Sequence, residues 1–354
     1  MTHREMVKAV LRGEKPEVIP SFAETPMDVT ALAEALPKET GDEARDEIER
    51  AKFFDNSSVS VGFGIAAQTL SRDKDHHRYR YETGAVWLER HWPTFCREMV
   101  ECPVRSAEDA LRFKMPDANE ERRWDESGTR RLVEAYHEAG YFVEGHVTGA
   151  WSGIYYYLTR FETILMWMGI EKEAAHALFD MTGKFSVDSA RRLVSCGVDS
   201  ITCACDLGTG SGLLFSPAMF REYVFPWLAQ LAQACHEHGT CFHLHSHGHI
   251  EGVMDGIVEA GVDMVNPVGP SDGNDLSMFK RRWGGRITLH GGISTTISLM
   301  SDREMRRHVA EVIEVGRAGG RFFPRTESGV PPMDARRVRL YIHAVGEERR
   351  KGYR

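Results

Sequence analysis

The fold is decided by residues 241–268, which read CFHLHSHGHIEGVMDGIVEAGVDMVNPV. A short β-rich run, a helical segment and a second apolar run follow one another within this stretch. The pattern predicts a strand over Cys241–His245, a helix over Ile250–Ala260 that Gly261 closes, and a strand over Asp263–Val268. Strands that alternate with helices of about ten or more residues are typical of βαβ units with parallel pairing.

The same alternation continues on both sides of this stretch. It predicts further strands at Val18–Phe22, Val59–Phe63, Tyr141–Val147, Ser200–Cys205, Arg286–His290 and Arg321–Pro324. It predicts helices at Ser216–His238 (with a kink or break at Pro226), Asp275–Trp283, Asp302–Arg317 and Asp334–Glu348. Eight strands in a chain of 354 residues favour a closed (β/α)8 TIM-type barrel. An open doubly wound sheet would need a glycine-rich phosphate loop after its first strand, and none is present there.

The stretch Thr69–Asp117 interrupts the alternation, because it is rich in polar and aromatic residues. We interpret it as an insertion after the second strand, with a small hairpin around Gly84, that covers one end of the barrel. An N-terminal extension precedes the barrel. Internal repeats and low-complexity linkers are absent from the sequence, so we expect residues 1–354 to form a single domain.

Composition excludes several classes of protein. The 44 basic and 52 acidic residues give a net charge of −8, whereas nucleic-acid binders normally carry a basic excess. No run approaches the roughly 20 apolar residues of a membrane span. Seven scattered cysteines are typical of reduced thiols, so we expect a cytoplasmic protein that binds neither nucleic acid nor membrane.

Four histidines alternate in the segment 241–250, and residues two apart on a strand share a face. His245 and His247 fall at the carboxyl end of a predicted barrel strand, where barrel enzymes keep their chemistry. Two neighbouring neutral imidazoles favour a metal site, with zinc as the usual occupant. The alternative is that they are polar side chains hydrogen-bonded inside the barrel. His243 lies one layer deeper, where we expect it to support the site or to contact substrate.

Other strand ends supply further candidates for the same site. Asp206 follows the fourth strand, as a general base, a partner of a metal-binding histidine or a loop cap. His146 and His290 end the third and seventh strands, and each can bind substrate or donate a proton. Trp151 and Tyr155 follow the third strand, either as a wall of the substrate pocket or as part of a helix packed on the barrel.

From Asp206 onward the chain resembles the uroporphyrinogen decarboxylase superfamily. The matching pieces are DLGTGSGLLFSPAMFREYVFPWL (206–228), HLHSHGHIEGVMDGIVEAGVDMVNP (243–267), RITLHGGIST (286–295) and GRFFPRTESGVPP (320–332). This superfamily includes the haem-pathway decarboxylase and zinc-dependent methyltransferases that move methyl groups between corrinoids and thiols. The resemblance independently implies a (β/α)8 barrel, and family members often pair as homodimers.

The resemblance is closer to the methyltransferase branch than to the decarboxylase. The decarboxylase carries an arginine-rich stretch after its first strand, whereas this chain has IPSFAETPMD there, with Glu24 and Asp28. In the methyltransferase branch the zinc ligands are a His-x-Cys pair on the fifth strand and a cysteine near the end of the last strand. His245 matches the histidine, His247 stands at the cysteine position, and Glu327 lies at or near the last cysteine.

The resemblance therefore implies zinc or another divalent metal held by His245, His247 and Glu327, unless Glu327 instead pairs with Arg325. Such an ion would be a harder Lewis acid than one held by thiolates, suited to an ether, alcohol or carboxylate oxygen. The implied reaction is methyl transfer between a small, methoxylated substrate and a corrinoid (cobamide), free or on a corrinoid protein. The alternatives are a lyase or decarboxylase acting on a small carboxylic acid, and a non-catalytic corrinoid-handling module.

Overall fold

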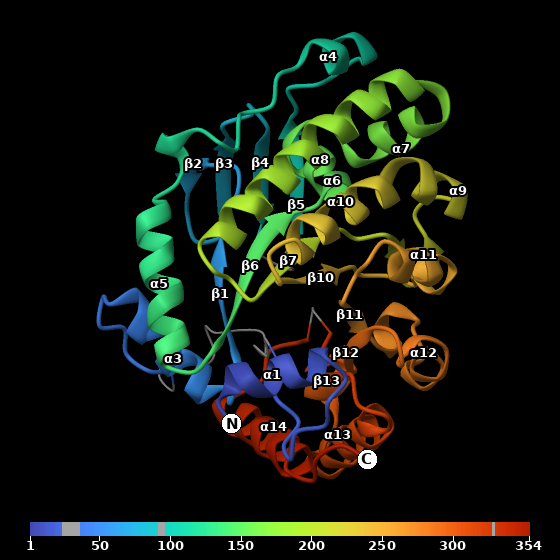
Figure 1. Cartoon of the computed structure of the whole chain (residues 1–354). Helices are drawn as coiled ribbons and strands as arrows, with labels where there is room; N and C mark the ends of the chain where they lie inside the picture. Colours follow the sequence, from blue (N-terminus) through green and yellow to red (C-terminus); the bar gives the residue numbers. More distant parts are fainter. Residues whose placement is uncertain (23–35, 91–95, 328–329) are drawn as a thin grey trace.

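The computed structural model describes residues 1–22, 36–90, 96–327 and 330–354 (Figure 1). Its main sheet has seven parallel strands in the order β1-β6-β7-β10-β11-β12-β13, and it curls into a half-barrel. The strands are β1 (Ser58–Gly62), β6 (Phe142–Thr148), β7 (Ser200–Ala204), β10 (Cys241–His245), β11 (Met264–Val268), β12 (Thr288–Ile293) and β13 (Phe322–Thr326). Seven of the eight predicted strands, and their parallel pairing, are confirmed.

The predicted strand at Val18–Phe22 is not formed in the described part of the chain, so the sheet has no eighth strand there to close it. Pro20 gives the physical reason, because proline has no N–H to donate to a ladder. The segment instead makes isolated hydrogen bonds to its surroundings. The Ser57 amide donates to the Ser21 carbonyl over 2.7 Å, and the Ile19 amide donates to the Arg349 carbonyl over 3.1 Å.

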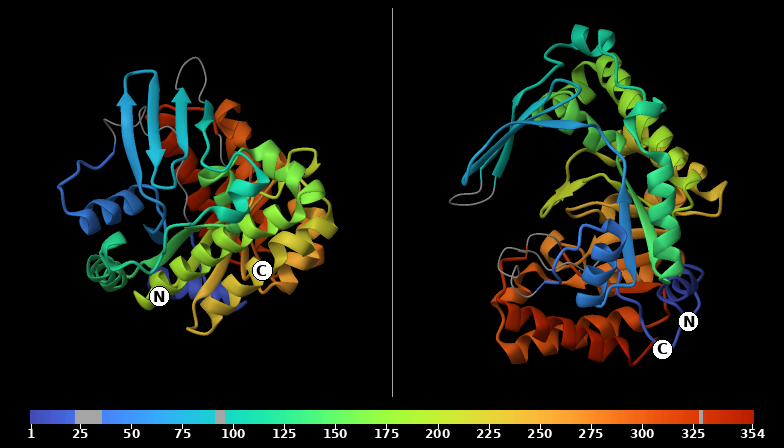
Figure 2. Two further views of the ribbon diagram at one scale, coloured as in Figure 1. Left: turned by 90° about the horizontal axis from the view of Figure 1, so that it is seen from above. Right: turned by 90° about the vertical axis from the view of Figure 1, so that its left-hand side faces the viewer.

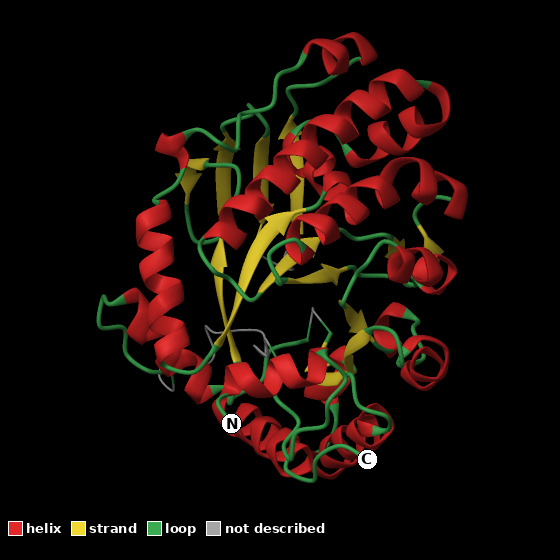
Figure 3. Ribbon diagram, in the orientation of Figure 1, coloured by secondary structure: helices red, strands yellow, loops and turns green. Residues whose placement is uncertain are grey.

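Helices cover the convex face of the sheet (Figure 3). The longer ones are α1 (His3–Leu11), α3 (Glu43–Phe53), α5 (Glu126–Glu138), α6 (Ala150–Tyr157), α7 (Phe161–Ile170), α8 (Lys172–Ser195), α10 (Phe225–His236), α12 (Leu276–Trp283), α13 (Asp302–Arg317) and α14 (Ala335–Arg349). Shorter ones are α9 (Pro217–Met219) and α11 (Met254–Glu259). The break predicted at Pro226 is confirmed, since a π-helical turn at Phe220–Val224 separates α9 from α10. No helix in the described ranges is long and apolar enough to cross a membrane.

The segment that interrupts the alternation of strands and helices forms a second sheet. Four antiparallel strands, β2 (Ala67–Arg72), β3 (His76–Tyr81), β4 (Val86–Arg90) and β5 (Cys96–Glu101), extend away from the main sheet (Figure 2). The predicted hairpin is the β3–β4 turn, in which Gly84 adopts φ +97°. The Trp87 indole donates to the Tyr156 carbonyl over 2.8 Å, which fastens this sheet to α6.

The two faces of the main sheet differ in chemistry. Its outward-facing side chains include Ile201, Leu244, Val265 and Leu289, none of which is exposed, and they pack under the helices. Its concave face, which we call the lumen, is layered. The floor is apolar and consists of Phe22, Phe142, Met264 and Phe323 together with Val7 and Val10 of α1. Polar and ionisable side chains lie above this floor, so the fold places the chemistry at the carboxyl ends of the strands.

A buried carboxylate joins the N-terminal helix to the base of the sheet. Asp199, just before β7, has a side chain only 1% exposed. It accepts hydrogen bonds from Arg4 of α1 over 2.8 Å, from His137 of α5 over 3.0 Å and from the Val143 amide over 3.1 Å. Lys8 lies 2.6 Å away. Burial alone would raise the pKa of Asp199, but the bonds to His137, Arg4 and Lys8 hold it well below its usual range.

We expect Asp199→Asn to lower the free energy of unfolding by about 2–3 kcal/mol at neutral pH, because it removes a buried charge that three elements share. The pKa is lower in the folded protein than in the unfolded chain. The carboxylate therefore contributes fully above the unfolded pKa of about 4, and its contribution is lost as the pH falls through the acid range. Urea unfolding at neutral and acidic pH measures the difference.

The control for this experiment is Glu108→Gln, which breaks an exposed pair with Arg112 and should have little effect. A difference between wild type and Asp199→Asn that does not shrink on acidification would contradict the assigned ionisation.

Candidate functional site

A buried carboxylate forms the centre of the polar layer in the lumen. Glu144 lies in the middle of β6 and is only 1% exposed. Its Oε2 accepts a hydrogen bond from Thr202 Oγ1 over 2.8 Å and lies 3.3 Å from His243 Nδ1. Burial raises the pKa of Glu144, but the contacts with His243 outweigh burial and lower it overall. An ionised carboxylate is therefore fixed below the mouth of the half-barrel, and His243 is its partner.

His290 lies in the same layer and does not reach the mouth as the sequence predicted. It is fully buried, because Phe22 covers it edge-on at a ring-centroid distance of 5.2 Å. Its Nε2 donates to the Phe22 carbonyl over 2.9 Å, so Nδ1 carries no proton. Burial, Arg325 and His243 lower the pKa of His290 well below its usual value. Within the described residues, His290 Nδ1 and His243 Nε2 are buried without hydrogen-bond partners.

The predicted metal pair stands at the carboxyl end of β10. The rings of His245 and His247 are 4.9 Å apart between centroids and nearly perpendicular, at 85°. Burial and the neighbouring His247 and Arg325 lower the pKa of His245 to about 3, so its ring is neutral at neutral pH. His247 Nδ1 donates to Asp272 Oδ2 over 3.0 Å. This bond and the charge of Asp272 overcome burial and raise the pKa of His247.

Two loops hold the histidine pair, because their main chains are hydrogen-bonded to each other. One loop follows β7 (205–209) and the other follows β10 (245–249). The Cys205 amide donates to the His245 carbonyl over 2.8 Å, and the His249 amide donates to the Thr209 carbonyl over 2.8 Å. Gly248 has φ +90°, and a Cβ there would lie 2.0 Å from the carbonyl carbon of Gly208. Only glycine allows this approach.

Asp206 belongs to the same contact between the two loops. Its Oδ1 accepts from the His247 amide over 2.9 Å, so Asp206 holds the main chain of a predicted ligand. Asp272 holds the ring of the same residue, and it also accepts from the Gly248 amide over 2.9 Å. Two carboxylates thus orient His247, one through its backbone and one through its side chain. Asp272 belongs to the short turn Pro270–Asp272 after β11.

Glu327, the third predicted ligand, supports this turn. It follows β13, is 1% exposed, and both carboxylate oxygens accept from the Ser271 amide, over 3.0 and 3.1 Å. Burial raises its pKa, and the bonds from Ser271 offset part of this rise. The alternative ion pair with Arg325 is not found in the described residues. Glu327 therefore acts on the Asp272 turn, and through it on His247.

The remaining candidates divide between the interior and the mouth. Trp151 is fully buried against Phe179 and Phe215, so helix packing accounts for its position. Tyr155 is half-buried, and its hydroxyl lies 3.0 Å from Ser152 Oγ. Burial and the nearby charge of Asp206 raise its pKa, which places Tyr155 near the mouth. His146 of β6 is exposed to the lumen, and Glu24 and Asp28 lie outside the described residues.

The described residues can be compared directly with the predicted metal site. No group of three or more His, Cys, Asp or Glu residues in the described ranges is positioned to hold a metal ion. His245, His247 and Glu327 thus belong to one hydrogen-bonded region. In that region Glu327 contacts the Asp272 turn and acts on His247 only through it. Their role as a ligand set stays a prediction.

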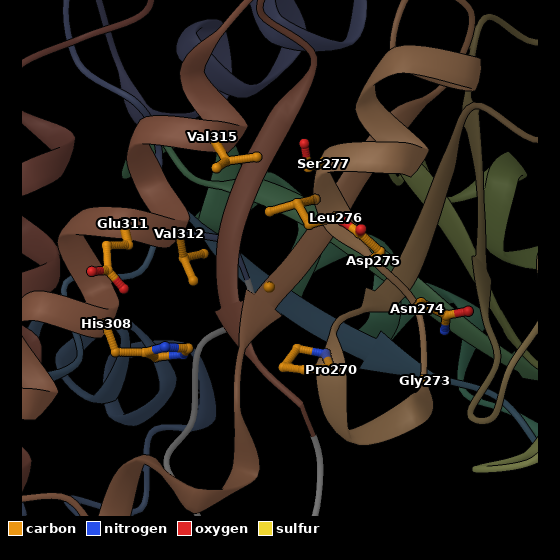
Figure 4. A pocket seen from close by; sticks show the side chains of 11 residues that line it. Pro270, Gly273, Asn274, Asp275, Leu276, Ser277, His308, Glu311, Val312 and Val315 are labelled. Atoms are coloured by element: carbon orange, nitrogen blue, oxygen red, sulfur yellow. The ribbon is translucent and has the colours of Figure 1, made fainter.

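A separate pocket lies between α12 and α13 (Figure 4). Its volume is about 480 Å³, and its lining includes Leu276, Val312, Val315 and His308. Pro270 and Gly273 also line it, so the pocket borders the turn that carries Asp272. None of the predicted site residues lines this pocket, so it is not the candidate active site.

Three functional candidates were missed by the sequence analysis. Glu144 was detectable in principle, because a charged residue in the middle of a buried strand needs a partner. Asp272 and Arg325 were not, since each lies in a different strand–loop unit from the histidines it affects. Their proximity to His247 and His245 follows from the curl of the sheet, which the sequence pattern does not specify.

We expect Asp272→Asn to lower the pKa of His247, because it removes the charge and the carboxylate bond while leaving the burial. Titration of metal-free protein, followed through the imidazole nitrogens by NMR, measures the change. Glu251→Gln is the matched control, because Glu251 lies 3.5 Å from the neighbouring His249. An unchanged His247 titration in Asp272→Asn would show that Asp272 does not orient the ring.

Comparison with known proteins places this geometry in a family. The model of uroporphyrinogen decarboxylase (URO-D) matches residues 98–347. A search of curated proteins returned no match. Among solved structures, a methyltransferase from Methanosarcina mazei is similar at 15% identity and TM-score 0.72, covering 98% of this chain and 99% of that one.

A second structure that is similar to the chain is a B12-independent methionine synthase from a Shewanella species, in complex with selenomethionine. Its identity is 11% and its TM-score 0.50, with coverage of 95% of this chain and 94% of that one. At such identities the likeness shows the fold, whereas the family model spans more than half of the chain. The motifs, the curled parallel sheet and this match together show that the chain belongs to the URO-D family.

Proposed function

We propose that this chain is a methyltransferase that moves a methyl group between a small methoxylated substrate and a corrinoid. Membership of the URO-D family and the fold shared with a methyltransferase over nearly the whole of both chains support this proposal. The single observation that carries it is the oriented pair His245 and His247 at the carboxyl end of β10. Barrel-type enzymes keep their reacting groups at this end of the sheet.

The chemistry available at the pair favours binding of an electron-poor centre. His245 is neutral at neutral pH, so one ring nitrogen presents a lone pair. The bond from His247 Nδ1 to Asp272 makes Nε2 the nitrogen that faces a ligand. A carboxylate behind an imidazole in this manner is the usual support of a metal-binding histidine.

The proposal includes zinc or another divalent metal, and the described residues fit only part of such a site. Two adjacent imidazoles, one of them backed by Asp272, fit two ligand positions. Glu327 accepts from the Ser271 amide through both its oxygens, and its place as the third ligand stays a prediction. We therefore propose His245 and His247 as the protein's metal-binding pair and assign no chemical step to the metal.

The chain's own contribution to demethylation is a proton. When the methyl–oxygen bond breaks and a bond from carbon to the reduced corrinoid cobalt forms, the departing oxygen must take up one proton. His146 is exposed in the lumen but is neutral at rest, because burial lowers its pKa. We assign it the relay of this proton: the ring takes up a proton from solvent and passes it to the departing oxygen. Asp206 is a positioning residue, because it contacts the His247 main chain.

Metal analysis combined with an activity assay tests the proposal. We expect purified protein to bind about one divalent ion per chain and to transfer methyl from a panel of methoxylated compounds to cob(I)alamin. His245→Ala should lose the ion and reduce transfer by at least about a hundredfold. His249→Ala is the matched control, because this neighbouring histidine pairs with Glu251 and should leave both measurements unchanged.

Two results would contradict the proposal. Wild-type protein that transfers methyl without binding any divalent ion would remove the metal from it. Release of carbon dioxide from a small acid, without any requirement for a corrinoid, would identify a lyase instead of a methyltransferase.

A further inference from the structure

The lumen contains a cation whose charge the described residues do not balance. Arg325 lies on β13 and faces the lumen opposite Gly292 of β12, which has no side chain to cover it. It is half-buried, yet it makes neither an ion pair nor a hydrogen bond within the described ranges. The two arginines that are buried in the described ranges differ from it, because Arg317 is paired with Glu348 and Arg349 with Asp55.

The carboxylates around the mouth already have other partners. Glu144 is bound to Thr202 and His243. Glu327 accepts from the Ser271 and Asp272 amides. Asp206 and Asp272 both hold His247, through its main chain and its ring. Each of these four carboxylates thus has other hydrogen-bond partners, and none of them pairs with Arg325 in the part of the chain that the structure describes.

Three imidazoles of the lumen lie close enough to Arg325 to be affected by its charge. The charge of Arg325 contributes to lowering the pKa of His146, His245 and His290, after burial in each case. These rings bring no charge of their own at neutral pH, but they offer N–H donors and lone pairs around the cation. The surroundings thus suit one anionic group with further hydrogen-bonding atoms.

Open space adjoins these residues. His146 is exposed although it lies in the middle of the sheet, and its neighbours Ser60 and Gly62 on β1 are exposed as well. A side chain on an inner strand reaches solvent only if the concave face is open beside it. A small molecule can therefore enter the lumen next to His146 and approach Arg325.

We propose that Arg325 binds a carboxylate of the substrate, so that the substrate class is a methoxylated carboxylic acid. The methoxy part of this inference rests on the proposed methyl transfer, whereas the carboxylate site rests on the lumen alone. A planar guanidinium matches a carboxylate through two parallel hydrogen bonds. A phosphate ester is a poorer match, because it carries nearly two negative charges and a single cation is available to it.

Bound in this way, the substrate would be oriented before reaction. Its carboxylate would lie at the β13 side of the lumen, and its remaining atoms would extend toward the carboxyl end of β10, where His245 stands. Arg325 would then be a binding residue that sets specificity.

Equilibrium binding of matched acids and amides tests the inference without any turnover. The probes are methoxyacetate and para-methoxybenzoate, each compared with its carboxamide, and calorimetry in the absence of corrinoid gives the dissociation constants. We expect wild-type protein to bind at least one acid more tightly than its amide, by about tenfold to a hundredfold. Arg325→Gln should abolish this preference, and Arg325→Lys should restore part of it.

Arg282→Gln is the matched control, because it removes the same charge from the exposed surface of α12, where Arg282 pairs with Glu251. It should retain the wild-type preference. Equal binding of acids and amides, absence of binding by both acids, or a preference that survives in Arg325→Gln would each overturn the inference. Because these measurements need neither methyl transfer nor metal, their failure is distinguishable from failure of the proposed function.

Discussion

The candidate site depends on one contact, in which the loop after β10 meets the loop after β7 backbone to backbone. The two loops share hydrogen bonds across residues 205–209 and 245–249, and Gly248 at φ +90° lets them approach to contact distance. Two of the three predicted ligands, His245 and His247, lie within this contact between the loops. Their positions are fixed before any ligand arrives, because main-chain hydrogen bonds rather than mobile side chains hold them.

The charged and neutral groups of the lumen lie in layers that differ in burial. An apolar floor with Phe22 at its centre excludes water from the layer of Glu144 and His243, so that the carboxylate is satisfied by its neighbours. Above it, the imidazoles of His146 and His245 are kept neutral, and Arg325 has no ion-pair partner among the described residues. A carboxylate substrate and a reacting group at the histidine pair are therefore compatible within one lumen. The deeper layer lies beneath the mouth, and the roles predicted for His243 and His290 stay predictions.

Much of this arrangement could be predicted from the sequence. Strand–helix alternation gave seven parallel strands, and spacing on β10 identified the imidazole pair, because both depend on local periodicity. The strand predicted at Val18–Phe22 does not form, because Pro20 has no N–H to donate. The sequence shows this proline, but the prediction gave more weight to the apolar pattern around it. Glu327 was assigned to the metal from its place near the end of β13. Its bonds to Ser271 depend on a turn from another unit, which only the three-dimensional fold brings together.

Anomalous diffraction at the zinc edge, from crystals grown with zinc and para-methoxybenzoate, tests the central claim most directly. The account predicts one anomalous peak within bonding distance of ring nitrogens of His245 and His247, and carboxylate density against the Arg325 guanidinium in the same lumen. A map in which both rings are held only by protein neighbours, with the acid bound elsewhere or absent, would contradict it.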